Sequence, residues 1–205
     1  MTSTPHACSD LLAVTMGDAC GIGPEIIAQW WPGGREAVVI GCPRVMARAV
    51  AWMPAERRPQ VRVLATLNDL SALATDDMGV WVSPGLPDDL LDAPLGRVDE
   101  RAGRAAAACI REAVRLAQTS EVAGIVTAPL HKEALALAGE PYPGHTELLQ
   151  AEGSPPGQPP APVRMMLAND QLKTVLVTIH VSLRQAIEQV TFDSVLETLR
   201  ITHRS

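Results

Sequence analysis

Short apolar runs alternate with helix-like segments along almost the whole chain, and this alternation constrains the fold more than any other feature. Val, Ile and Leu dominate the runs, and several are continuously apolar, which is typical of strands covered on both faces. The seven runs are residues 11–16, 37–41, 61–65, 79–83, 124–127, 164–168 and 174–180. Since Gly and Pro flank them, strands are favoured over buried helices, and a mostly parallel sheet is expected.

Helices are expected between these runs. One covers residues 24–30, with Pro24 in its first turn, and the longest covers residues 99–119, where small apolar residues recur at helical spacing. Thr191 is the expected N-cap of a last helix. Right-handed crossovers then place helices on both faces of the sheet, as in an α/β fold. Residues 153–162 hold five prolines and are expected to form a surface loop.

Composition excludes several classes of protein. The chain has 17 basic and 23 acidic residues, so sequence-independent nucleic-acid binding is not expected. No apolar run reaches the roughly 18 residues that span a bilayer, and residues 1–10 lack the features of a secretory signal. The four cysteines, Cys8, Cys20, Cys42 and Cys109, match no zinc or redox spacing. A cytoplasmic protein with reduced thiols and no membrane partner is therefore expected.

Candidate chemistry lies where the expected strands end, because ligands of open α/β sheets bind at the carboxyl ends of strands. Residues 15–25 run from a strand through a glycine-rich turn into a helix, which suits either an anion site or simply a tight turn. The glycine spacing matches neither a dinucleotide fingerprint nor a Walker A loop. Cys20 is the one cysteine placed for a nucleophilic role, and the GxSxG and HExxH motifs are absent.

Three further polar residues stand at such positions. Lys132 follows the strand at 124–127, His145 opens a helix after Gly144, and His180 ends the run at 174–180. Each has a structural explanation as well: a solvated lysine, a capped helix with an incidental histidine, and a hydrogen-bonded structural histidine. The functional alternatives are binding of a phosphate or hydroxyl group at His145 and metal binding or proton transfer at His180.

Taken together, these segments resemble the 4-hydroxythreonine-4-phosphate dehydrogenase family of pyridoxal phosphate (pyridoxine) biosynthesis. The similarity runs in order from about residue 11 to the end of the chain. The matching segments are 15–25 (family TxGDPAGIGPE), 127–132 (TAPxxK or TGPVHK), 143–149 (GHTE), 165–168 (MMLA) and 180–184 (H-x-P/S-L-R). Ala19 and Cys20 depart from the family's Pro-Ala, although the glycines are kept.

The resemblance implies a three-layer α/β/α fold of the isopropylmalate and isocitrate dehydrogenase type, in a homodimer with active sites between domains. Residues 1–120 are then expected to form the first domain and residues 121–205 part of the second, which carries dimerisation, metal and substrate functions. Because family members continue much further, the chain is expected to be a truncated, amino-terminal portion with little activity alone.

The resemblance also implies an activity, namely oxidation of 4-phosphooxy-L-threonine by NAD followed by decarboxylation. A divalent ion (zinc, magnesium or cobalt) held by three histidines would assist. By position, His145 and Thr146 match the substrate-binding pair and His180 the first metal ligand, while Lys132 is expected only to lie near the substrate. The alternatives are a sister enzyme for threonate or erythronate phosphate, or a non-catalytic phosphate-binding remnant.

Overall fold

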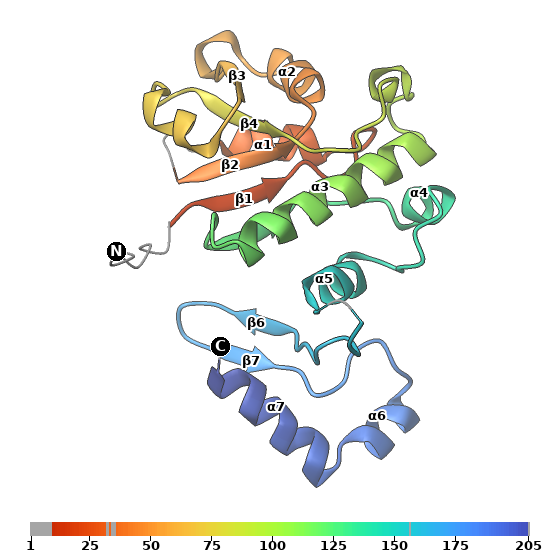
Figure 1. The fold of residues 1–205 in the computed structure, drawn as a ribbon. Coiled ribbons are helices and arrows are strands. Elements are labelled where there is room, and N and C mark those ends of the chain that lie inside the picture. The colour runs from red at the N-terminus through yellow and green to blue at the C-terminus, as the bar shows by residue number, and fades with distance from the viewer. Residues whose placement is uncertain (1–9, 32, 34–35, 156, 205) are drawn as a thin grey trace. The chain divides into compact units, whose positions relative to one another are not determined.

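The structure is a computed structural model that describes residues 10–31, 33, 36–155 and 157–204. The chain divides into two compact units, Met1–Pro156 and Gly157–Ser205, and each is described here by itself (Figure 1). The amino-terminal residues 1–9, and Cys8 with them, lie outside the described residues. None of the described helices is long and apolar enough to cross a membrane.

The first unit is built on a five-stranded parallel sheet with the order β3-β4-β2-β1-β5. Its strands are β1 (Leu12–Thr15), β2 (Ala37–Gly41), β3 (Val61–Leu64), β4 (Met78–Val82) and β5 (Gly124–Thr127). All five residues of β2 are buried, as a strand covered on both faces requires. The first five predicted strands and the parallel sheet are confirmed.

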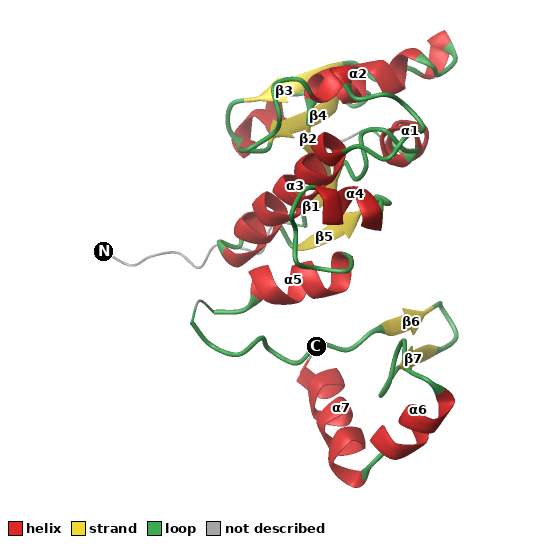
Figure 2. Cartoon of the chain, turned by 90° about the vertical axis from the view of Figure 1, so that its right-hand side faces the viewer, coloured by secondary structure: helices red, strands yellow, loops and turns green. Residues whose placement is uncertain are grey.

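Helices cover both faces of this sheet. They are α1 (Gly23–Trp30), α2 (Pro43–Ala51), α3 (Glu100–Gln118), α4 (Lys132–Leu137) and α5 (His145–Gly153), with short 3-10 turns at Ala55–Arg57, Leu67–Ala72 and Leu90–Asp92. Helix α3 crosses in front of β1 in Figure 1, while α1 lies behind the sheet. Helices α4 and α5 pack against α3, and Figure 2 shows the three helices next to one another. The predicted three-layer α/β/α class is therefore confirmed.

The long helix α3 is fixed at its start and along one face. The Asp99 carboxylate caps it by accepting a hydrogen bond from the backbone N–H of Arg101 at 2.9 Å. Because Gly103 has no side chain, the backbone of α4 can approach the backbone of α3 closely at this residue. A small core of Ala107, Ile110, Val114, Leu135 and Leu148 then joins α3 to α4 and α5. This packing positions the two helices that carry Lys132 and His145.

The second unit contains two antiparallel strands and two helices. They are β6 (Met166–Ala168), β7 (Lys173–Val175), α6 (Leu183–Gln189) and α7 (Phe192–Arg204). The strand predicted for residues 174–180 is wrong beyond Val175, since β7 pairs with a strand of only three residues. His180 follows five residues later, in a bend with φ 55°. These two runs therefore form a separate antiparallel pair and do not extend the parallel sheet.

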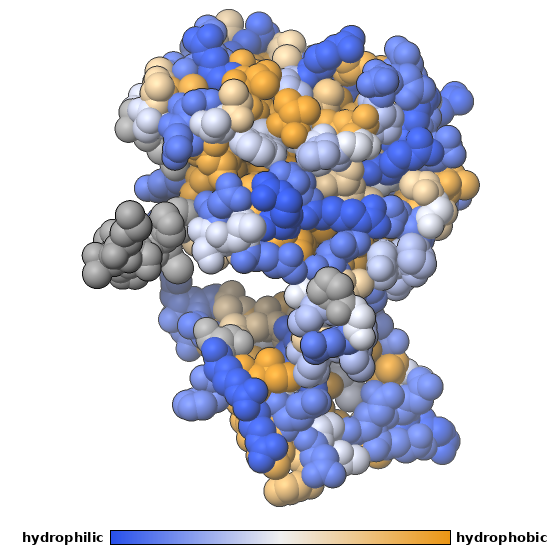
Figure 3. All heavy atoms as spheres, in the orientation of Figure 1, coloured by the Kyte–Doolittle hydropathy of each residue, from blue (hydrophilic) through white to orange (hydrophobic). Residues whose placement is uncertain are grey.

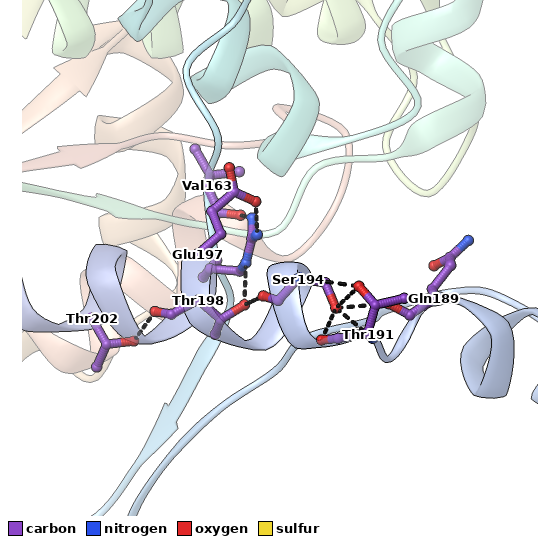
Figure 4. A network of polar contacts seen from close by, with 8 residues as sticks. Val163, Gln189, Thr191, Ser194, Glu197, Thr198 and Thr202 are labelled. Carbon is purple, nitrogen blue, oxygen red and sulfur yellow. Dashed lines mark hydrogen bonds and ion pairs between the residues drawn. The ribbon is translucent and has the colours of Figure 1, made fainter.

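Side-chain hydrogen bonds hold α7 within the second unit (Figure 4). Arg164 donates from Nε to Thr198 Oγ1 at 2.8 Å and pairs with Glu197. The hydroxyl of Thr191 accepts from the backbone N–H of Ser194, which confirms the predicted N-cap. Apolar side chains nevertheless lie on the surface of both units (Figure 3), among them Phe192 at 80% exposure. Polar side-chain contacts thus connect α7 to Arg164 and to Gln189 within the second unit.

The first unit extends beyond residue 120, because β5, α4 and α5 belong to it. The division predicted at residues 120 and 121 concerns the two domains of the family's fold and stays a prediction. The proline-rich loop is confirmed from Ser154 onward in its described residues, while α5 ends at Gly153.

Candidate functional site

The turns that follow β1 and β5 lie in contact at one edge of the sheet. The strands pair in register, with Thr15 level with Thr127, so their carboxyl ends coincide. The backbone N–H of Asp18 donates to Pro129 O at 2.9 Å. Gly17 has φ 72°, and a β-carbon there would lie 2.4 Å from Pro129 O. The structure therefore brings together two of the segments that the sequence singled out.

Besides the bond from Asp18 to Pro129, three hydrogen bonds stabilise the glycine-rich turn. The Asp18 carboxylate accepts from the backbone N–H of Cys20 at 2.8 Å. Arg48 of α2 donates from Nη2 to Ala19 O at 2.7 Å, and the N–H of Gly96 donates to Cys20 O at 2.8 Å. Ala19 and Cys20, the residues that depart from the family motif, are both buried. The substitution is therefore accommodated in a turn that is fixed on several sides.

The thiol of Cys20 is poorly suited to nucleophilic chemistry. Burial and the neighbouring Asp18 carboxylate raise the pKa of this thiol to about 11. A thiol with such a pKa stays protonated at neutral pH, and the thiolate is the reactive form. Burial beside the Asp18 carboxylate therefore disfavours the cysteine-nucleophile alternative.

His145 joins the third segment to the same place. Its half-buried imidazole lies with Nε2 3.1 Å from Ala128 O, next to Pro129. A carbonyl oxygen only accepts, so Nε2 donates, and in the neutral ring Nδ1 keeps its lone pair. Burial lowers the pKa of His145 below its ordinary value of 6.5, and the charge of Lys132 lowers it further, although the bond to Ala128 works in the opposite direction. The imidazole is therefore neutral at neutral pH and presents Nδ1 as an acceptor.

Lys132 and Thr146 complete the group of predicted residues in the first unit. Lys132 is exposed and is the first residue of α4, and the half-buried Thr146 is the second residue of α5. A β-carbon on Gly144 would lie 3.6 Å from Lys132 Cε. The lysine stem therefore lies beside Gly144, the residue that precedes α5.

His180 belongs to the second unit, so its relation to His145 stays a prediction. Its imidazole is exposed, and its positive φ is uncommon for a residue other than glycine. An exposed imidazole suits one ligand of a divalent ion. Among the described residues, however, no group of three His, Cys, Asp or Glu side chains is arranged to hold a metal ion. The described residues therefore fit one donor of the implied metal site.

The fold defines an α/β/α domain with a parallel sheet, a class of protein in which ligands bind at the carboxyl ends of the strands. The sequence model of the family described as pyridoxal phosphate biosynthetic protein PdxA matches residues 35–205. The chain belongs to this family.

Relatives agree in sequence and in structure. The 4-hydroxythreonine-4-phosphate dehydrogenase of Beijerinckia indica is 43% identical over 94% of this chain and 55% of its own length. The D-threonate 4-phosphate dehydrogenase of Pectobacterium atrosepticum is 38% identical over 91% of this chain and 56% of its own. A crystal structure of 4-hydroxythreonine-4-phosphate dehydrogenase from Klebsiella pneumoniae superposes with a TM-score of 0.80 at 35% identity, covering 97% of this chain and 59% of that one. The chain thus spans about half the length of the relatives it matches.

Two residues that stabilise the glycine-rich turn, Arg48 and Gly96, are not predicted from the sequence. Arg48 lies on an amphipathic helix where an arginine normally marks only a solvated face, and Gly96 lies in a loop without a distinctive motif. Both act on backbone groups of the glycine-rich turn that are far away in the sequence. No local sequence pattern predicts a contact between residues so far apart in the chain.

Proposed function

We propose that this chain supplies part of the substrate site of an NAD-dependent dehydrogenase that oxidises 4-phosphooxy-L-threonine in pyridoxal phosphate biosynthesis. The observation that carries the proposal is the contact of His145 with Ala128, beside the turn at Gly17 and Asp18. Three segments with the family's motifs therefore lie at one edge of the sheet. The names of the relatives supply the class of reaction.

In this reaction the carbon that bears the hydroxyl group gives up a hydride and the hydroxyl gives up a proton. The resulting β-keto acid then loses carbon dioxide. The neutral His145 accepts a hydrogen bond at Nδ1, and the hydroxyl of Thr146 donates or accepts one, so the pair orients polar groups of the substrate. Partial burial of His145 makes its hydrogen bonds stronger than they would be in water.

We assign His180 as one ligand of a divalent metal ion, with the remaining ligands outside the described residues. A bound divalent ion supplies Lewis-acid polarisation of the alcohol oxygen. This chain would contribute the exposed imidazole of His180 to the ligands of that ion. The full assembly is proposed to be a cytoplasmic homodimer that takes NAD, as the family resemblance implies.

A second substrate has a specific observation in its favour, since a 38% identical relative is named D-threonate 4-phosphate dehydrogenase. The two substrates share the phosphate, the carboxylate and the oxidised hydroxyl group and differ in the substituent on carbon 2. Comparing the binding of 4-phosphooxy-L-threonine and D-threonate 4-phosphate to the same chain separates the two enzymes. A phosphate-binding remnant would bind both substrates and inorganic phosphate equally.

Replacing His145 by alanine is expected to weaken binding of 4-phosphooxy-L-threonine by roughly 10- to 100-fold, the effect of a lost hydrogen bond in a partly buried site. Isothermal titration calorimetry on the 205-residue chain measures this. His203→Ala is the matched control, because His203 is an exposed residue of α7 in the second unit and leaves the affinity unchanged. Equal affinity of His145→Ala and wild type, or no binding by the wild type, contradicts the proposed function.

A further inference from the structure

We infer that Lys132 is a substrate-binding residue, whose ammonium group receives an anionic group of the substrate beside His145. The inference rests on the proposed function and adds a role for a residue that the family resemblance places only near the substrate. Its basis is the position of the lysine stem, within van der Waals reach of the Gly144 position that precedes His145.

Lys132 takes part in no ion pair in the part of the chain that the structure describes. Every ion pair found among the described residues uses an arginine, and none includes Lys132. It is also the first residue of α4, where a positive charge is unfavourable against the helix dipole. A cation held at such a position without a partner is therefore available for an external anion.

His145 itself supplies no positive charge to an anion bound beside it. The imidazole is half-buried against Ala128 and stays neutral at neutral pH, so it contributes a hydrogen bond and no charge. Lys132 is the charged group that acts on this ring. A neutral imidazole and a nearby ammonium together offer the hydrogen bond and the charge that a phosphate or carboxylate prefers.

The neighbouring carboxylate restricts where the anion binds. Glu147 Oε2 would also lie 3.6 Å from a β-carbon on Gly144, so it faces the same glycine as Lys132 Cε. Its negative charge repels an anion on its own side. An anion at the Lys132 ammonium is therefore expected to bind away from the Glu147 carboxylate.

The test compares Lys132→Met and Lys132→Arg with Lys173→Met by isothermal titration calorimetry. Lys173 is the other lysine of the chain and lies on β7 in the second unit, so its loss is the matched control. Lys132→Met is expected to weaken binding of 4-phosphooxy-L-threonine by roughly 10- to 100-fold, as for a charge-assisted hydrogen bond. Lys132→Arg is expected to retain most of the affinity, and Lys173→Met all of it.

Two further readouts identify the anion and exclude a purely structural effect. Titration with L-threonine and with inorganic phosphate distinguishes a carboxylate from a phosphate at Lys132, since only the ligand that carries the recognised anion loses affinity in Lys132→Met. In the ligand-free variant, NMR titration should show a higher pKa for His145, because the repelling charge is gone. Wild-type affinity in Lys132→Met contradicts the Lys132 assignment alone. Absence of binding by the wild type contradicts the proposed function as well.

Discussion

Replacing Gly17 by alanine is expected to lower the free energy of unfolding by about 2–5 kcal/mol. Gly17 has φ 72°, a conformation that costs an L-residue about 1–2 kcal/mol. The new β-carbon would also lie 2.4 Å from Pro129 O, so the turn after β1 and the segment after β5 must separate. Because this junction supports Ala128 and His145, substrate binding should fall with stability. Urea denaturation followed by circular dichroism measures the change.

Gly139→Ala is the matched control for this variant. Gly139 has φ 80°, yet a β-carbon there would meet nothing within 4 Å. The control therefore carries the conformational cost of about 1–2 kcal/mol without the collision. If both variants lose the same stability, the contact between Gly17 and Pro129 has no energetic importance and the proposed junction is contradicted.

Replacing Gly103 by alanine is expected to displace α4 from α3 and to destabilise the first unit by about 2 kcal/mol. A β-carbon on Gly103 would lie 2.0 Å from Ala134 O and 2.3 Å from Ala134 C, and backbone atoms cannot rotate away. Overpacking of this kind costs about 3 kcal/mol, offset by up to about 1 kcal/mol from the better helix propensity of alanine. Thermal unfolding and calorimetric binding of 4-phosphooxy-L-threonine report the two effects, since α4 carries Lys132.

Gly153→Ala is the matched control for Gly103→Ala, because it changes helix propensity without creating a steric collision. Gly153 ends α5, and a β-carbon there meets nothing within 4 Å. This variant should be as stable as the wild type or slightly more stable. A stable Gly103→Ala chain with normal binding would show that α4 does not need its close approach to α3.

The sheet of the first unit is predictable because its strands are buried on both faces. A continuously apolar run such as residues 37–41 reports that environment directly in its composition. The run at 174–180 is equally rich in strand-forming residues, but a strand also needs a partner backbone, and β6 supplies only three residues. The length of a partner strand is a tertiary property, so the sequence of residues 174–180 overestimates β7.

The individual residues of the site can be predicted from the sequence, but the contacts that bring them together cannot. The motifs identify Lys132, His145 and Thr146 one by one from the resemblance. The bond from Asp18 to Pro129 depends on the pairing of β1 with β5, which are more than a hundred residues apart in the chain. The hydrogen bond from Arg48 to Ala19 O depends in turn on the packing of α2. Neither contact leaves a local pattern, so the structure was needed to show that the segments meet.

The central claim is that three separate segments bind one phosphorylated ligand, and NMR mapping of backbone amides tests it most directly. Addition of 4-phosphooxy-L-threonine should shift the amides of residues 17–21, 128, 130–132 and 145–146 together, with one common dissociation constant. Shifts confined to another surface, such as the cavity of about 350 Å³ lined by Gln29, Trp52 and Arg57, would contradict the account. Shifts in only one of the three segments would contradict it equally.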